Sequence, residues 1–391
     1  MTEATASLAA DLAAVEALPP GRLINADLAP TPPDSRTWNT WHLAALWVGM
    51  SVCIPTYMLA ASMIESGMTW GQSLAVIFLG NAIVLVPLVI NAHAGTRYVS
   101  PFPVFARASY GLTGAHVPSL ARSIVACGWF GIQTWIGGLA INALLGILWP
   151  AWADLGGAWT FMGYGLSYFI SFLLFWLINV YFVWAGTESI KWMETLAAPF
   201  LIAMGIALLA WAVSTVGGLG TILRESEAMS QATAAHTGLD FFLKLFLPWL
   251  TAMVGFWATV SLNIPDFTRY ARSQKDQAVG QAIGLLITMP LFSFIGIAVT
   301  GATLILYGEA IWNPVDLLVR MSAEGGAILG LISLFVIVVA TLSTNIAANV
   351  VAPANSVSNL SPGRIGFRLG GLIAALFGIF ILPWKLLDLY Q

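Results

Sequence analysis

The chain has 391 residues, of which 59% are hydrophobic and only 8% are charged, and its formal net charge is −3. Because a soluble domain carries roughly 25% charged residues, this composition excludes an ordinary soluble protein and indicates a polytopic membrane protein. The small net charge favours neither a nucleic-acid-binding protein nor one with a strongly acidic partner.

Residues 1–40 precede the first apolar window and form a polar segment. They contain acidic residues and prolines but no basic region followed by an apolar core, so we interpret them as a cytoplasmic N-terminal tail and not as a signal peptide. Cys53 and Cys127 both fall in apolar segments, which predicts no disulfide framework. The four histidines are scattered without metal-ligand spacing.

Nine apolar segments follow, and a spanning helix needs about 20 such residues. Eight charge-free windows are long enough and a ninth is shorter. The sequence therefore predicts an all-α integral membrane protein. We expect its helices at residues 41–63, 72–94, 119–149, 157–184, 193–216, 242–264, 278–306, 327–351 and 366–383.

Lys and Arg residues predict the orientation of these helices, because cytoplasmic loops carry an excess of them. Eleven of the fifteen fall in segments on the side of the N-terminal tail, and four fall on the other side. We therefore expect a multi-pass protein of the inner (plasma) membrane with a cytoplasmic N-terminus, an extracellular loop at 217–241 and, after nine helices, an extracellular C-terminus.

Two helices carry residues that interrupt helical hydrogen bonding. The first reads WVGMSVCIPTY (47–57), with Gly49 and Pro55. The sixth reads VGFWATVSLNIPDF (254–267), with Gly255, Asn263 and Pro265. In lipid, freed backbone survives only where it lines a cavity, and interrupted helices at corresponding places indicate a transporter of inverted repeats. The alternative is that Gly and Pro are simply frequent in membrane helices.

The eighth helix concentrates polar residues at mid-membrane depth, since half of the ten residues of ATLSTNIAAN (340–349) are polar. At about 100° per residue, Ala340, Ser343 and Thr344 share one face. Their oxygens, with unwound carbonyls of the first helix near Gly49 and Val52, suit a small hard cation. The alternative is that the hydroxyls bond back to carbonyls of their own helix.

A neighbouring face of the eighth helix carries the amides of Asn345 and Asn349. On the third helix, Trp129 and Gln133 are four residues apart and share a face, and we place Trp257 at the break of the sixth helix. Indoles offer flat stacking walls, and carboxamides offer both donors and acceptors. Together these groups suit a flat neutral ring such as a pyrimidine, a purine or a ureide.

Five segments then resemble the nucleobase–cation symporter-1 family, whose members carry hydantoins, allantoin, uracil, cytosine and related rings. The segments are LWVGMSVCIPTY, GTRYVSPFPVFARASYG, CGWFGIQTWIGG, NIPDFTRYARSQKDQ and LSTNIAANVVAPAN. The resemblance covers about residues 36–385 in order and implies the leucine-transporter fold.

The resemblance also implies roles for single residues. Trp129 and Trp257 match the tryptophans that sandwich the ring, and Gln133 and Asn349 match its hydrogen-bonding amides. The family's sodium site falls on the carbonyls of Gly49, Val52 and Ala340 and the hydroxyls of Ser343 and Thr344. Those hydroxyls favour sodium over proton coupling.

One observation from the residues agrees with sodium: the central parts of the nine predicted helices contain no carboxylate that could relay a proton. Asp266 is the nearest candidate, and we expect it to pair with Arg269 or Arg272. We expect no organic cofactor.

Two features depart from the family. Cys53 stands where hydantoin-type members carry an amide that also touches the substrate, and a thiol is a weak donor, which leaves the substrate open. The family has twelve helices and this chain about nine. The resemblance thus predicts a complete first repeat at 41–216 and an incomplete second repeat at 242–391.

The expected function is import of a planar cyclic amide by cation symport, with sodium as the coupling ion and the lipid bilayer as surroundings. The alternative is a transport-inactive fragment of such a permease, or one whose missing wall an oligomer supplies. A membrane enzyme is disfavoured because the predicted helices show no nucleophile–base pair, paired carboxylates or metal cluster. A channel is disfavoured because no charge ring or repeated filter sequence appears.

Overall fold

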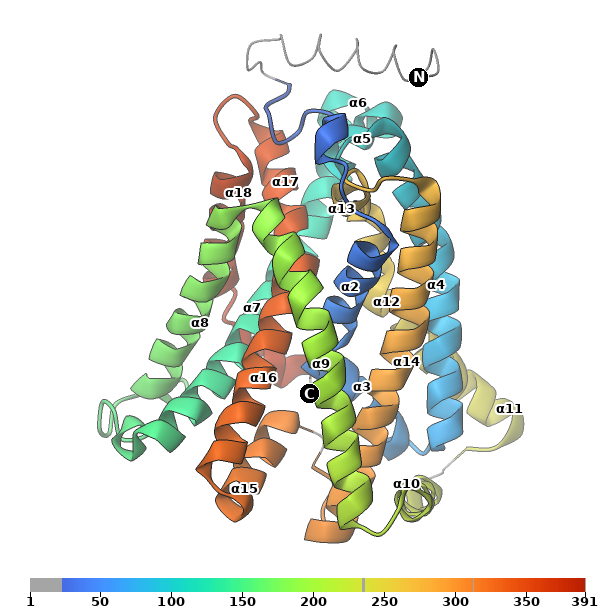
Figure 1. Ribbon diagram of the computed structural model, residues 1–391, viewed down its shortest axis with the longest axis vertical. Helices are drawn as coiled ribbons and strands as arrows, with labels where there is room; N and C mark the ends of the chain where they lie inside the picture. Colours follow the sequence, from blue (N-terminus) through green and yellow to red (C-terminus); the bar gives the residue numbers. More distant parts are fainter. Residues whose placement is uncertain (1–22, 234–235, 312, 391) are drawn as a thin grey trace.

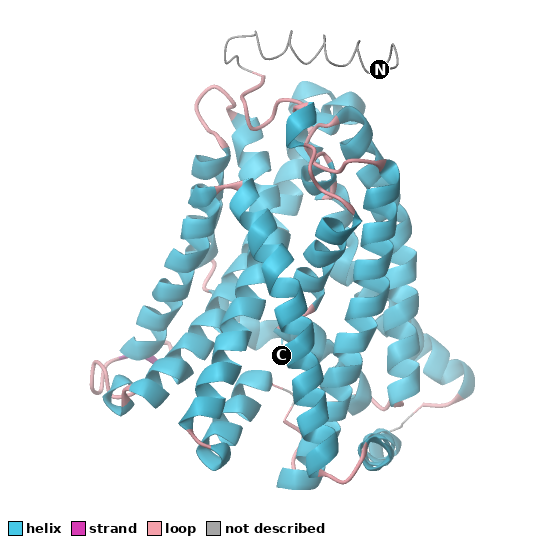
Figure 2. Ribbon diagram, in the orientation of Figure 1, coloured by secondary structure: helices cyan, strands magenta, loops and turns pink. Residues whose placement is uncertain are grey.

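The computed structural model describes residues 23–233, 236–311 and 313–390, and most of them are helical (Figures 1 and 2). Long helices run side by side along the long axis of the molecule. One small antiparallel pair of strands, β1 (Thr160–Phe161) and β2 (Tyr164–Gly165), precedes α8 (Leu166–Ala185).

Every predicted helix has a counterpart. Seven helices of the described residues are long and apolar enough to cross a membrane, a broken pair can form an eighth span, and α18 is a shorter apolar helix. Besides α8, they are α2 (Thr40–Ser51) with α3 (Ile54–Glu65), α4 (Trp70–Tyr98), α7 (His116–Leu148), α9 (Thr187–Thr215), α12 (Leu247–Asn263), α14 (Gln274–Tyr307), α16 (Ala327–Asn345) with α17 (Val351–Leu360), and α18 (Phe367–Phe380).

Shorter elements connect these helices. At one end of the molecule, which we call the α5–α6 end, lie α5 (Phe102–Phe105), α6 (Arg107–Gly114) and α13 (Pro265–Thr268) (Figure 1). At the opposite end lie α10 (Leu219–Thr233), α11 (Gly238–Phe241) and α15 (Pro314–Gly325). The predicted loop at 217–241 thus contains two helices, α10 and α11. The remaining elements are η1 (Pro33–Ser35), η2 (Pro150–Trp152), η3 (Phe242–Phe246), η4 (Ile346–Val350) and α19 (Pro383–Tyr390).

The break predicted in the first helix is confirmed. α2 ends at Ser51, α3 begins at Ile54, and the two helix axes differ by 57°. Val52 and Cys53 between them have non-helical backbone angles. Pro55 lies in the first turn of α3, where its missing N–H leaves no helical hydrogen bond unmade. The kink therefore exposes backbone carbonyls in the middle of the bundle.

The break predicted within residues 254–267 of the sixth helix lies at the end of that stretch, between Asn263 and Pro265. Gly255 and Trp257 are inside the continuous helix α12, and the chain leaves helical hydrogen bonding only at Ile264. Our placement of Trp257 at a break is therefore wrong. A glycine inside a helix costs only about 1 kcal/mol and keeps its N–H, whereas Pro265 has none to donate.

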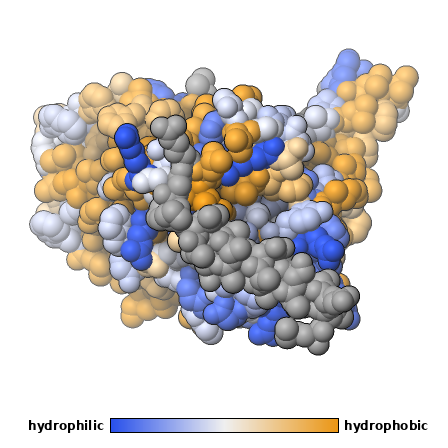
Figure 3. All heavy atoms as spheres, turned by 90° about the horizontal axis from the view of Figure 1, so that it is seen from above, coloured by the Kyte–Doolittle hydropathy of each residue, from blue (hydrophilic) through white to orange (hydrophobic). Residues whose placement is uncertain are grey.

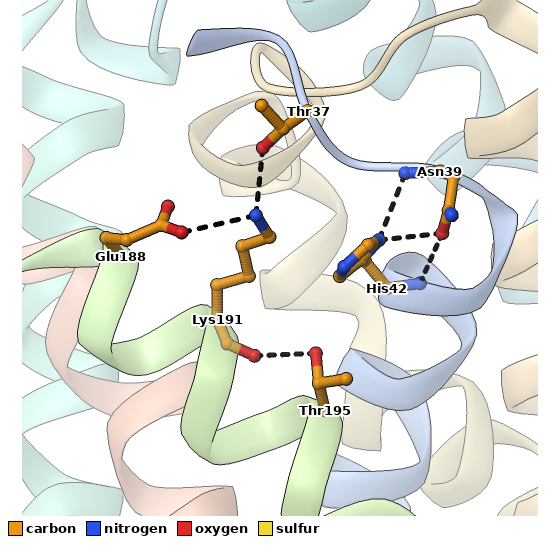
Figure 4. A network of polar contacts seen from close by, with 6 residues as sticks. All are labelled: Thr37, Asn39, His42, Glu188, Lys191 and Thr195. Atoms are coloured by element: carbon orange, nitrogen blue, oxygen red, sulfur yellow. Dashed lines mark hydrogen bonds and ion pairs between the residues drawn. The ribbon is translucent and has the colours of Figure 1, made fainter.

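The fifth helix begins at Thr187 and not at 193. The charges of this first part excluded it from an apolar window, yet they have partners there. Lys191 Nζ donates to Thr37 Oγ1 at 2.9 Å and lies 3.3 Å from Glu188 Oε1 (Figure 4). Glu194 consequently lies about two turns inside α9 and is buried.

The described part of the N-terminal tail packs onto the α5–α6 end. Arg36 Nη2 donates to the carbonyl of Ala271 at 3.0 Å, and Trp38 pairs with Ala271 as an isolated parallel bridge. Asn25 Nδ2 donates to Ser358 Oγ at 3.0 Å. Seen from this end in Figure 3, hydrophilic residues lie among hydrophobic ones on the face of the bundle.

Helix α2, the first half of the first span, approaches α14, the seventh span, closely at two glycines of α14. A Cβ at Gly280 would lie 2.7 Å from Leu43 Cβ, and a Cβ at Gly284 would lie 2.6 Å from Trp47 Cβ and 2.8 Å from the carbonyl oxygen of Ala44. Small residues spaced four apart let membrane helices approach to van der Waals distance. This contact holds α2, with its broken end, against the centre of the bundle.

Substitution of Gly284 by alanine should therefore destabilise the protein. The added methyl forces α2 and α14 apart, and overpacking of this kind costs about 1–3 kcal/mol. Thermal unfolding in detergent would show a lower melting temperature. Gly255→Ala is the matched control, because nothing lies within 4 Å of its Cβ position; equal melting temperatures for the two variants would contradict the prediction.

Candidate functional site

One small cavity brings together all five side chains predicted to bind a ring. It has a free volume of about 40 Å³ and lies between α3, α7, α12 and the α16–η4 segment. This volume holds a few water molecules and not a heterocycle. Its lining residues are Cys53, Pro55, Arg122, Trp129, Gln133, Phe256, Trp257, Thr259, Val260, Thr344, Ala348 and Asn349.

Aromatic rings form one side of this cavity. The rings of Trp257 and Trp47 form a T-shaped pair, with centroids 5.3 Å apart and an interplanar angle of 88°. Trp257 Nε1 donates to Met289 Sδ at 3.0 Å. Phe256 contacts both indoles, with centroid distances of 6.2 Å to Trp129 and 4.8 Å to Trp257. The predicted pair of indoles thus lines one cavity, with a phenyl ring that the sequence analysis did not single out.

The amides of the cavity come from two helices. Gln133 is 2% exposed, and its Oε1 has no hydrogen-bond partner. Asn349 lies in the π-helical turn η4, and its Nδ2 donates to Asn345 Oδ1 at 3.0 Å. Asn345 Nδ2 in turn donates to Asn179 Oδ1 and to Thr134 Oγ1, both at 3.1 Å. This buried chain orients the Asn349 amide from behind, and α8 takes part in it through Asn179.

Arg122 is a lining residue that the sequence analysis counted as a loop charge. It lies in α7, is 3% exposed, and faces the cavity from the α5–α6 side. Its Nε donates to Asn263 Oδ1 at 2.8 Å and its Nη2 to the carbonyl of Ala348 at 2.6 Å. One guanidinium thereby joins α7, α12 and η4. The charge-free window that predicted this helix begins at residue 123, so Arg122 was assigned to the preceding loop.

Asp266 does not form the ion pair that we expected. Its Oδ1 accepts the backbone N–H of Phe102 at 2.9 Å, and its Oδ2 has no hydrogen-bond partner. Arg269 instead donates to the carbonyl of Asp27 and to Tyr270 Oη. The expected pairing with Arg269 or Arg272 is wrong, since α13 directs the carboxyl toward α5 rather than along its own chain.

A second group of polar atoms lies beside the cavity, where the broken first helix meets α16. Thr344 Oγ1 donates to the carbonyl of Gly49 at 2.8 Å. Ser343 is fully buried and lies against Gly49, because a Cβ there would overlap Ser343 Oγ. Val52 and Ala340 are also buried and belong to one apolar cluster. The five residues predicted to hold a cation are therefore gathered at one helix junction.

A carboxyl group belongs to this junction as well. Ser343 Oγ donates to Glu194 Oε2 at 2.6 Å, and Glu194 is 1% exposed. Our expectation that the predicted helices hold no central carboxylate is therefore wrong. The predicted start of the fifth helix at 193 put Glu194 at a helix end, whereas the observed start at Thr187 carries it into the bundle. A cation-binding role for these residues stays a prediction.

Cys53 lines the cavity from the break of the first helix. Its Sγ lies 3.2 Å from Thr56 Oγ1, and the thiol is 2% exposed. The chain contains one other cysteine, Cys127, also buried. Cys53 can thus report whether the cavity is open, once Cys127 has been replaced.

Arg122→Gln should open the cavity toward the α5–α6 end. Glutamine is too short to reach both Asn263 Oδ1 and the Ala348 carbonyl, so the link between three helices is lost. In a Cys127→Ser background, a membrane-impermeant maleimide applied at that end should label Cys53 faster than in the parent. Arg320→Gln, at the opposite end, should leave the rate unchanged. Equal rates for all three proteins would show that Arg122 does not close this side.

Almost the whole helical region is similar in sequence to known permeases. Residues 30–390 match a family of permeases for cytosine and purines, uracil, thiamine and allantoin. The chain is 45% identical to the purine-uracil permease of Arabidopsis thaliana over 368 residues, 93% of the chain and 59% of that protein. It is 42% identical to the allantoin permease of Bacillus subtilis over 367 residues, 94% of the chain and 73% of that protein.

A solved structure shares the fold. It is a nucleobase–cation-symport-1 family transporter in a closed conformation with bromovinylhydantoin bound, with a TM-score of 0.77 and 26% identity. The similarity covers 93% of this chain and 75% of that one. The fold expected from the sequence, an all-α membrane protein of the leucine-transporter type, is thereby confirmed. The chain spans about three fifths to three quarters of the length of these relatives.

Proposed function

Because the chain belongs to the family of permeases for cytosine and purines, uracil, thiamine and allantoin, we propose that it imports a planar cyclic amide by symport with sodium. The observation that carries this proposal is the adjacency of two groups of residues at the first helix. The ring cavity contains Cys53 and Thr344, and the Thr344 hydroxyl is bonded to Gly49 of the oxygen-rich junction.

The cavity suits a flat neutral ring. Trp129 and Trp257 offer indole faces, worth about 0.5–1.5 kcal/mol each beyond buried area. Gln133 Oε1 is an acceptor without a partner, and a ring N–H would satisfy it. The cavity is too small for a ring as it stands, so these side chains separate when substrate enters. Allantoin, hydantoin, uracil and related nucleobases all have the required edge of alternating carbonyl and N–H groups.

The junction suits a sodium ion. The carbonyls of Gly49, Val52 and Ala340 and the hydroxyls of Ser343 and Thr344 supply oxygen ligands from helices on both sides of the break. A cation held there pulls the first helix toward α16 and so shapes the neighbouring ring cavity. Such coupling is reciprocal, so substrate tightens sodium by the same factor.

The membrane potential gives this coupling its direction. One sodium ion moving down about 100 mV releases about 2.3 kcal/mol, equivalent to roughly fifty-fold accumulation of substrate. We place the protein in the plasma membrane with the N-terminus in the cytoplasm, which puts the α5–α6 end inside. One group of helices then rocks against another and exposes the site to each side in turn. The first group contains the first, second, sixth and seventh helices (α2–α3, α4, α12 and α14). The second group contains the third, fourth, eighth and ninth helices (α7, α8, α16–α17 and α18).

Uptake of radiolabelled allantoin, uracil or benzylhydantoin should fall strongly when choline replaces sodium. Ser343→Ala and Thr344→Val should weaken the sodium dependence, because each removes one oxygen ligand. Thr341→Val is the matched control, since its hydroxyl lies on another face of the same helix. Uptake that does not change when choline replaces sodium would show that sodium is not the coupling ion. Ring binding without any uptake would favour a transport-inactive fragment.

Trp257→Ala should weaken ring binding by about tenfold or more, since an indole face of about 1.5 kcal/mol is lost. Isothermal titration of the purified protein with the ring that is taken up would measure this change. Trp149→Ala is the control, because Trp149 is 54% exposed and remote from the cavity. An undiminished affinity in Trp257→Ala would exclude this residue from the binding site.

A further inference from the structure

Glu194 is a buried acidic residue for which the proposed function has so far given no role. Among the described residues, no Lys, Arg or His nitrogen lies within 4.0 Å of its carboxyl group. Its Oε1 has no hydrogen-bond partner, and the residue is 1% exposed. A buried carboxylate without a counter-charge is unfavourable, and buried charges are normally paired or bound to a metal ion.

The lysine one turn earlier on the same helix does not supply that charge. Lys191 Nζ points to Thr37 and Glu188 at the α5–α6 end (Figure 4). Helices α2, α8, α14 and α16 also pack against α9. The one basic side chain of α2 is His42, whose Nδ1 lies 2.7 Å from Asn39 Oδ1 (Figure 4), and α8 contains no charged residue. The described part of α16 contains no charged residue, and the charges of α14 lie in its first turn, where Asp276 bonds Thr40 and Ser273.

The carboxyl group instead faces the junction that we propose as the cation site. Its Oε2 accepts from Ser343 Oγ at 2.6 Å, and a Cβ at Gly49 would overlap both of these oxygens. Gly49 in turn accepts from Thr344 at 2.8 Å. Three helices thus bring a carboxylate, two hydroxyls and a carbonyl to one place, and the absence of a side chain at Gly49 leaves the room.

Charge balance indicates what this arrangement binds. Carbonyl and hydroxyl ligands are neutral, so they would leave the charge of a buried sodium ion uncompensated. A carboxylate makes the occupied site neutral overall, and this favours the burial of both charges. The hydroxyl proton of Ser343 points at Glu194, which leaves the lone pairs of that hydroxyl free for a cation.

We propose that Glu194 is the anionic ligand of the cation site and supplies the negative charge that holds sodium at the junction of α2, α9 and α16. This inference rests on the proposed function and adds to it a ligand from the fifth helix. The fifth helix is then drawn to the first and eighth when the ion binds.

The test is direct binding of radiolabelled sodium to the full chain in lipid nanodiscs, with choline chloride keeping the ionic strength constant. Glu194→Gln keeps the size of the side chain and an oxygen to accept from Ser343, and removes only the charge. Because a buried charge pair loses its partner, sodium affinity should fall by at least about tenfold. Glu188→Gln, a carboxyl on the same helix whose side chain is 68% exposed, should change affinity less than about twofold.

Two further variants separate a ligand from a merely structural residue. Glu194→Asp keeps the charge and should bind sodium more tightly than Glu194→Gln. The double variant Ser343→Ala, Glu194→Gln should lose less affinity than the two single losses combined, because neighbouring ligands of one ion are coupled. Sodium affinity in Glu194→Gln equal to that in Glu188→Gln would overturn the inference, and so would independent effects at Ser343 and Glu194.

Ring binding in the same nanodiscs distinguishes this inference from the proposed function. If the parent protein binds sodium through Glu194 but no ring, the proposed function fails and the role of Glu194 stands. If the parent protein binds a ring but its sodium affinity does not depend on Glu194, the role of Glu194 is contradicted and the proposed function stands. Absence of sodium binding to the parent would overturn the inference.

Discussion

The contact between the broken first helix and the eighth helix is the constraint on which the rest of the structure depends. Helix α2 stops at Ser51 and leaves carbonyls without helical partners, and lipid offers none. Thr344 supplies a donor to one of them, the carbonyl of Gly49. The polar residues of α16 are therefore needed at this depth because the helix opposite them is interrupted.

Two groups of residues share this contact. Thr344 lines the ring cavity and also bonds the carbonyl of Gly49, while its neighbour Ser343 bonds the carboxyl of Glu194. A displacement of α16 by a fraction of an ångström would alter both groups, since the side chains between them are buried and closely packed. The proposed ion site and the proposed ring site thus lie in direct contact, and coupling between them would need no long pathway.

Buried polar side chains elsewhere hold neighbouring helices together. Arg122 joins three helices on one side of the cavity, and the Asn179–Asn345–Asn349 chain joins α8 to the π-helical turn. In the low-dielectric interior, a buried hydrogen-bond network is strong when all its polar groups are paired, whereas a polar group left without a partner is unfavourable. Close approach at Gly280 and Gly284 adds a contact between α2 and α14 that depends on shape alone.

The sequence by itself determined the class of protein, the existence of nine apolar helices, the break in the first helix and five of the residues that line the cavity. These follow from local patterns: runs of apolar residues, a glycine and a proline six residues apart, and side chains four apart on one helix face. Only the tertiary structure decided which charged residues are buried. Arg122 and Glu194 lie near the ends of apolar windows, where hydropathy cannot tell a loop from a helix. The helix start at Thr187, the burial of Glu194 and the direction of Asp266 depend on partners distant in the chain, which are Thr37, Ser343 and Phe102. No local pattern contains those partners, because packing brings them together.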